Sequence, residues 1–97
     1  MSRSKIFITG KVTRVGFRNF IKKTATDMGL VGTVQNVVDP ATNKKQAVEV
    51  IVEGDKKIVG KLIRQCTIGP SRAKPKNIIV SDIKNPDGSF TEFSILK

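Results

Sequence analysis

The stretch from Gly10 to Arg18 (GKVTRVGFR) joins two segments of different periodicity. Before it, Ile6 and Ile8 alternate with Phe7, which predicts a strand over residues 5–12. After it, apolar residues recur with helical spacing, which predicts a helix over residues 17–28. The first N–H groups of a helix have no internal partner, and the helix dipole favours negative charge there. We therefore expect an oxyanion site for phosphate, to which Arg18 adds a planar fork of donors.

The rest of the chain continues this alternation of strands and helices. We expect strands over residues 30–38, 46–53, 77–83 and 90–96, and a second helix that Asp55 caps and that buries Cys66. The turn at residues 85–88 predicts that the last strand forms a hairpin with the one before it. This order predicts one α+β domain over residues 1–97. Its fold is the ferredoxin-like split βαβ sandwich (β-α-β-β-α-β), with two helices on one face of an antiparallel sheet.

The amino-acid composition limits the catalytic chemistry that this chain can carry out. The 97 residues contain one cysteine and no histidine, which removes histidine-based nucleophiles and makes the usual zinc sites untenable. A single cysteine forms no internal disulfide, no apolar run approaches the ~20 residues of a membrane span, and the first residues lack a signal-peptide pattern. We expect a cytoplasmic protein with no metal or cofactor. The net charge of +10 fits either anionic partners or a solvated basic surface.

Two motifs and their spacing resemble the acylphosphatase family. The family's first signature is matched here by Gly10, Val12, Val15, Phe17 and Arg18. The second is matched by Gly32, Val34, Asn36, Val48 and Gly54. The resemblance covers nearly the whole chain, in order and on the fold expected above.

The resemblance implies hydrolysis of acyl phosphates (carboxylic–phosphoric mixed anhydrides) to carboxylate and inorganic phosphate, without metal or cofactor. It implies that Arg18 and Asn36 are catalytic, with Asn36 positioning the attacking water. The substrate phosphate would be held by the loop residues Thr13, Arg14, Val15, Gly16, Phe17 and Arg18. The expected partners are a small acyl phosphate and inorganic phosphate, which is product and inhibitor. We expect a monomer that makes no membrane contact.

Three residues depart from the family's loop pattern. Thr13 replaces a glutamine, Arg14 a glycine and Gly16 an aromatic residue. Arg14 either adds a phosphate contact, crowds the loop or is a solvated cation, whereas Gly16 can restore backbone freedom. The hairpin between Asn36 and Val48 is longer than the family spacing. We interpret it as a neutral insertion, because hairpin tips tolerate added length.

Other interpretations stay open at this point. Arg18 is alternatively an ordinary helix-surface arginine, and Asn36 an edge or bulge residue of its strand. Residues 5–10 also resemble the first-strand half of an RNA-recognition motif, and the charge suits RNA. The matching strand over 46–53, however, has no aromatic residue and carries two acids. A third alternative is an acylphosphatase-like domain that has lost turnover and binds RNA or another anionic or protein partner.

Overall fold

Strands and helices alternate along the part of the chain that the computed structural model describes, residues 2–13, 15–83 and 90–96. Their bounds are β1 (Ser2–Lys11), α1 (Phe17–Asp27), β2 (Val31–Asp39), β3 (Lys44–Gly54), α2 (Lys56–Ile68), β4 (Lys74–Ile83) and β5 (Phe93–Ile95). This order confirms the ferredoxin-like plan expected from the sequence. Neither helix in these ranges has the length and apolar content needed to cross a membrane.

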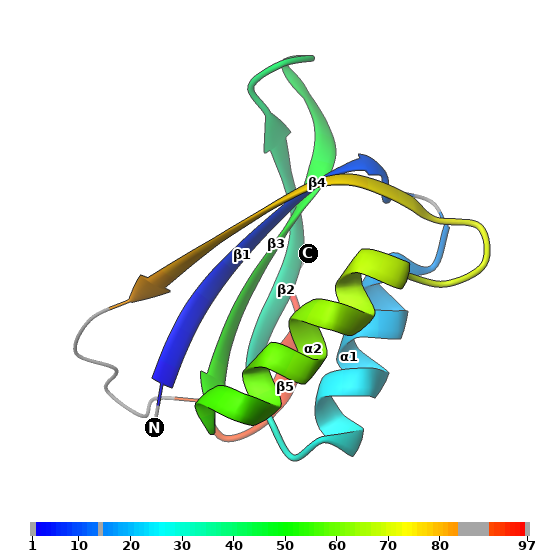
Figure 1. The fold of residues 1–97 in the computed structure, drawn as a ribbon. Coiled ribbons are helices and arrows are strands. Elements are labelled where there is room, and N and C mark those ends of the chain that lie inside the picture. Colours follow the sequence, from blue (N-terminus) through cyan, green and yellow to red (C-terminus); the bar gives the residue numbers. More distant parts are fainter. Residues whose placement is uncertain (1, 14, 84–89, 97) are drawn as a thin grey trace.

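The strands form one sheet in the order β4-β1-β3-β2-β5 (Figure 1). β1 pairs antiparallel with β3 on one side and with β4 on the other, and β2 pairs antiparallel with β3. Ile6, for example, faces Val50 on β3 and Val80 on β4. Paired residues share a face of a sheet, so this register places the apolar residues of neighbouring strands side by side.

The core lies between the sheet and the two helices, which cover the same face (Figure 1). β1 and β3 present their alternate apolar residues to this face, and α1 and α2 each add a buried stripe. The core side chains are Ile6, Ile8, Val48, Val50 and Val52 from the sheet, with Phe17, Ile21, Ala25, Val59, Leu62 and Cys66 from the helices. Each large apolar side chain buried in this way contributes roughly 1.5–3 kcal/mol. The stripes predicted from helical spacing are confirmed.

The last strand is in a different place from the one predicted. β5 does not pair with β4, so the hairpin prediction is wrong: β5 pairs parallel with β2 at the opposite edge of the sheet. This position buries Phe93 in the core, where it is 4% exposed. The burial of Phe93 is the physical reason why the chain crosses to the far edge. The turn predicted at residues 85–88 lies outside the described residues.

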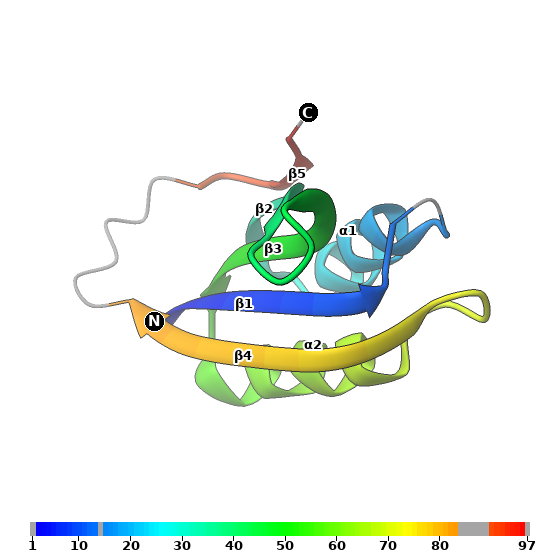
Figure 2. The ribbon, with the colours of Figure 1, turned by 90° about the horizontal axis from the view of Figure 1, so that it is seen from above.

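The β2–β3 hairpin projects beyond the rest of the sheet, and Figure 2 looks down on it from above. Its tip, residues 40–43, is fixed by Asp39. The Asp39 carbonyl accepts from Asn43 N at 2.7 Å and from Thr42 N at 3.1 Å, and its Oδ1 accepts from Ala41 N at 2.9 Å. Asn43 takes the left-handed conformation at φ 57°. The hairpin is therefore an ordered extension of the sheet.

Candidate active site

The first backbone amides of α1 have no capping side chain among the described residues. Gly16 precedes the helix at φ 76° and ψ 17°, and no described side chain caps the first turn, which contains no acidic residue. The first amides of a helix have no acceptor inside it. The other helix differs, because Asp55 caps α2 by accepting from Lys57 N at 2.8 Å. The chain thus satisfies the amino end of α2 with its own carboxylate and leaves that of α1 free for an external anion.

Phe17 anchors this helix end to the core. Its ring is 1% exposed and packs edge-to-face against Phe20, with the ring centroids 6.2 Å apart. The Phe17 ring therefore has a packing role, and only its backbone amide is available to a ligand. The left-handed Gly16 turns the chain sharply into the helix, a conformation that glycine adopts without steric cost. An added Cβ at Gly16 would meet nothing within 4 Å, so its requirement is conformational rather than one of space.

Arg18 follows Phe17 on the first turn of α1 and is half-buried. Its guanidinium makes no hydrogen bond or ion pair with any of the residues that the structure describes. An arginine held on a helix start with its donors unused is suited to bind a phosphate through two parallel hydrogen bonds. This geometry agrees with the prediction from the sequence that Arg18 binds phosphate.

Asn36 lies on β2 opposite Val48, on the face of the sheet that the helices cover. Its Oδ1 is buried and accepts no hydrogen bond from the described part of the chain. A buried amide oxygen without a partner costs roughly 1–3 kcal/mol, so it calls for a bound water or a role in the site to offset that cost. Thr13, from the loop before α1, lines the same pocket as Asn36. The fold thus brings the loop and β2 together.

The remaining candidates take different positions. Thr13 is half-buried in the Asn36 pocket, whereas Val15 packs against the edge of the core. Arg14 lies outside the described residues. Arg18 is not among the side chains that line the Asn36 pocket, so the structure joins Asn36 to the loop through Thr13.

Three residues of the site were missed from the sequence. Lys44, Lys45 and Gln46, from the start of β3, line the pocket that contains Thr13 and Asn36. The sequence signal is the pair of adjacent lysines inside the hairpin that the sequence analysis interprets as a neutral insertion.

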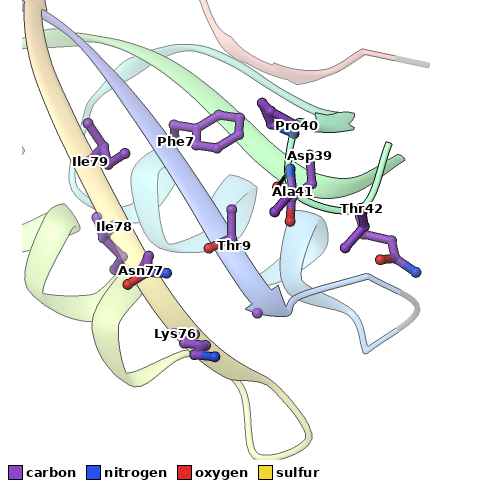
Figure 3. Close-up of a pocket in the computed structure, with 12 residues that line it drawn as sticks. Phe7, Thr9, Asp39, Pro40, Ala41, Thr42, Lys76, Asn77, Ile78 and Ile79 are labelled. Atoms are coloured by element: carbon purple, nitrogen blue, oxygen red, sulfur yellow. Dashed lines mark hydrogen bonds between the residues drawn. The ribbon is translucent and has the colours of Figure 1, made fainter. Parts of the chain in front are cut away.

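A second pocket, of about 640 Å³, lies on the face of the sheet that the helices leave open. Figure 3 shows Phe7 of β1 between Pro40 of the hairpin and Ile79 of β4, all three of which line this pocket. Neither Arg18 nor Asn36 lines it, although Gln46 lines both pockets. This pocket therefore contains neither of the two residues that the sequence predicts to be catalytic.

Two carboxylates of β3 also point to the open face. Glu53 pairs with Arg3 at 2.9 Å and Glu49 with Lys5 at 3.4 Å. Phe7, the aromatic residue expected to stack a base in the RNA-binding alternative, shares this face with both acids. The two ion pairs cancel the charges of Arg3 and Lys5, so these four residues offer RNA phosphates no excess of positive charge beside Phe7.

Cys66 belongs to the core and not to the site. It is fully buried, and burial raises the pKa of its thiol from the usual value near 9.0 to about 12. A thiol that stays protonated at neutral pH is a poor nucleophile and a poor metal ligand. Within residues 2–13, 15–83 and 90–96, no three histidine, cysteine, aspartate or glutamate side chains gather in a way that could hold a metal ion.

The fold and the site define a ferredoxin-like α+β domain with an oxyanion site at an open helix end. The sequence profile of the acylphosphatase family matches residues 4–95. The chain is 40% identical to an acylphosphatase of Chlorobaculum tepidum over 97% of its own length and 95% of the relative's. It is 34% identical to an acylphosphatase of Caldivirga maquilingensis, covering 96% and 92% of the two chains.

Solved structures agree with these relatives. The crystal structure of acylphosphatase from Bacillus subtilis superposes with a TM-score of 0.89 at 27% identity, and all of both chains is covered. The protein described here belongs to the acylphosphatase family, and it is an enzyme of that family.

Proposed function

We propose that the protein hydrolyses acyl phosphates to a carboxylate and inorganic phosphate, without a metal ion. The open amino end of α1 and Arg18 bind the substrate phosphate, and Asn36 positions the attacking water. The observation that carries this proposal is the buried Asn36 Oδ1, which has no hydrogen-bond partner among the described residues and lies in a pocket shared with Thr13 of the loop before α1. An acceptor in that situation suits the O–H of a water molecule.

The reaction proceeds by displacement at phosphorus. The water oxygen attacks phosphorus, the bond from phosphorus to the acyl oxygen breaks, and its electron pair leaves with the carboxylate. One proton of the water stays on the new P–OH and the other moves to a phosphate oxygen. A dianionic acyl phosphate thus gives one carboxylate and one dihydrogen phosphate, and the charges balance. The carboxylate is a stable leaving group, so the reaction needs positioning and charge stabilisation more than a strong base.

The decisive test is hydrolysis of benzoyl phosphate by the wild type and by two variants. Arg18→Ala removes the charged donors, and we expect it to lower kcat/KM by at least ~10³. Asn36→Ala should lower kcat by ~10²–10³ while the inhibition constant of inorganic phosphate changes little, because phosphate binding does not use the amide. Unchanged activity when EDTA is present is the expected result for metal-independent hydrolysis.

Arg64→Ala is the matched control, because Arg64 lies exposed on α2 and carries the same charge. It should retain wild-type kinetics. Full activity in Arg18→Ala would overturn the assignment of the phosphate site.

The RNA-binding and non-catalytic alternatives predict a different outcome. A wild-type protein without measurable turnover would end the hydrolase proposal. Salt-sensitive RNA binding that Phe7→Ala abolishes would then favour an RNA-binding domain. RNA binding that Phe7→Ala leaves unchanged would instead favour a non-catalytic domain whose basic surface binds another anionic partner.

A further inference from the structure

We propose that a second copy of this chain pairs with the exposed edge of β4, which joins two sheets edge to edge in a weak twofold dimer. The two β4 strands run antiparallel, and Ile79 of each copy lies opposite Ile79 of the other. The inference does not depend on the proposed hydrolysis. A monomer is expected from the sequence alone, and the edge of β4 is the feature that favours a dimer at high protein concentration.

The two outer strands of the sheet differ in length. β5 has three residues, whereas β4 has ten, and Figure 2 shows them at opposite sides of the sheet. β4 pairs with β1 on one side only. Alternate N–H and C=O groups of such a strand point away from its neighbour, so they are free to pair with a strand of another molecule. The long edge of β4 therefore offers the larger backbone surface.

Most of this edge lacks the features that keep edge strands apart, which include lysines, prolines and β-bulges. Pro75 and a break in the β1–β4 register protect its first residues. Over residues 77–83 the register is continuous, and the sequence NIIVSDI contains no lysine or proline and one charged residue, Asp82. Ile79 and Val80 are 59% and 42% exposed there. This segment is therefore suited to pairing with another strand.

The edge is complementary to itself when it is read in opposite directions about Ile79. In an isologous dimer each residue before the axis lies opposite the residue equally far beyond it. With the axis at Ile79, apolar residues meet apolar ones, polar residues meet polar ones, and opposite charges meet. The pairs are Ile79 with Ile79, Ile78 with Val80, Asn77 with Ser81, and Lys76 with Asp82.

The neighbouring registers do not have this complementarity. A twofold axis that relates antiparallel strands keeps the same face of both sheets on the same side, so a half-residue shift is excluded. An axis at Val80 would place Ile78 opposite Asp82, and an axis at Ile78 would place Lys76 opposite Val80. Both arrangements set an apolar residue against a charge. The self-complementary register at Ile79 is the argument for a second copy as the partner.

Pairing about Ile79 also continues the apolar rows of the sheet. Phe7 of β1 lies opposite Ile79 on the open face, and Ile8 lies opposite Ile78 on the face that the helices cover. In the dimer, Ile79 would meet its counterpart, and Ile78 would meet Val80 of the second copy. Cross-strand apolar neighbours stabilise a sheet, so each face would gain contacts.

Lys76 and Asp82 supply the charge complementarity. Neither forms an ion pair within the described ranges, and the Asp82 carboxylate accepts one hydrogen bond, from Ser4 Oγ at 3.3 Å. The dimer would form the Lys76–Asp82 pair twice, once on each side of the axis. The net charge of +10 on each copy opposes association. At about 0.15 M salt, however, charges farther apart than about 8 Å are largely screened, so the close pairs matter more.

Sedimentation velocity of the full chain tests the assembly. We expect the wild type to shift from monomer toward dimer between about 10 µM and about 1 mM, because interfaces smaller than about 1,200 Å² are weak. Ile79→Lys places two like charges at the axis and should weaken dimerisation at least tenfold, a change of about 1.4 kcal/mol.

Ile68→Lys is the matched control, because Ile68 is an isoleucine at the end of α2 that is 64% exposed. It makes the same change of charge and should dimerise like the wild type. Circular dichroism checks that both variants are folded. Equal weakening in both variants, or a wild type that stays monomeric at the highest concentration, would overturn the inference.

A charge exchange tests the register without altering Ile79. Asp82→Lys sets Lys76 against a second lysine and should weaken the dimer. The double variant K76D/D82K restores opposite charges between the copies and should recover most of the association. Both variants lose the Ser4 hydrogen bond, so that loss does not distinguish them. A double variant as weak as the single one would contradict the register.

Oxidative cross-linking tests the position of the axis directly. Cysteines opposite each other in an antiparallel pair have Cα atoms about 4.5–5.5 Å apart, within the range of a disulfide. Ile79→Cys should therefore cross-link to itself between copies. Asn77→Cys should not, because its counterpart lies four residues, or about 13 Å, along the strand. The native Cys66 is buried and does not compete. Cross-linking of Asn77→Cys alone, or of neither variant, would overturn the proposed pairing.

Discussion

Asn36 is a residue whose chemistry conflicts with its position. Asparagine is disfavoured in strands, and here its amide oxygen is also buried without a hydrogen-bond partner in the part of the chain that the structure describes. The sequence signal was the first of these facts, because a polar amide in a strand pattern stands out. Its burial without a partner could not be predicted, since it depends on how β2 packs under the loop before α1.

This conflict predicts opposite effects on stability and activity. Asn36→Val should raise the free energy of unfolding by about 1 kcal/mol, because it removes an unsatisfied buried group and improves strand propensity. It should also reduce benzoyl phosphate hydrolysis severely. Urea denaturation and the hydrolysis assay measure the two effects.

Asn77→Val is the control, because Asn77 is an exposed strand asparagine on β4. It should change stability by less than Asn36→Val and leave activity unchanged. A loss of stability in Asn36→Val would show that the amide has a structural role and contradict the interpretation.

At the scale of elements, α1 and α2 differ in whether a side chain caps their amino ends. Asp55 satisfies the amides of α2, whereas Gly16 leaves those of α1 open. Sequence reasoning identified both ends, because Asp55 and the stretch from Gly10 to Arg18 are local patterns. The left-handed conformation of Gly16 also agrees with the expectation that it restores backbone freedom to the loop.

The contrast predicts that the cap of α2 is purely structural. Asp55→Ala should lower the free energy of unfolding by about 1 kcal/mol, because the Lys57 amide loses its acceptor. The urea midpoint should fall while kcat on benzoyl phosphate stays at the wild-type value. Asp55→Ser, which keeps a capping oxygen, should recover most of the stability, and a kcat that follows stability would contradict the separation of the two helix ends.

β5 is the element that sequence reasoning misplaced. Alternation shows that residues 90–96 can form a strand, but it does not choose between two sheet edges that are both able to pair. The choice depends on where Phe93 is buried, which is a property of the assembled core. The lysines of the hairpin were missed for a related reason, because the place of a hairpin tip is set by the sheet and not by its own residues.

At the scale of the whole molecule, the net charge of +10 favours the binding of anions. The sequence predicts the sign of this effect, because a positive field attracts anions at distances shorter than the screening length. Binding of inorganic phosphate to the native state should therefore raise the melting temperature, and the effect should shrink as salt is added.

Thermal unfolding at increasing phosphate concentration measures this effect. At a phosphate concentration of about 100 times Kd, the stabilisation should approach 2.7 kcal/mol, and Arg18→Ala should abolish it. Chloride at matched ionic strength is the control for screening. A similar rise in melting temperature with Arg18→Ala would mean that phosphate acts on the general surface and not at α1.

The position of β1 in the sheet has a consequence for how the protein folds. Arg3 pairs with Glu53 on one side and with Ile83 on the other, so the first strand finds both partners only after long loops have closed. Closing such loops costs entropy before any contact is gained, which slows folding compared with helical bundles of similar size. α1 follows β1 closely in the sequence, so we expect its open amino end to reach its place beside the sheet only when β1 has paired. For this chain, we therefore expect the ability to hold an anion to appear late in folding.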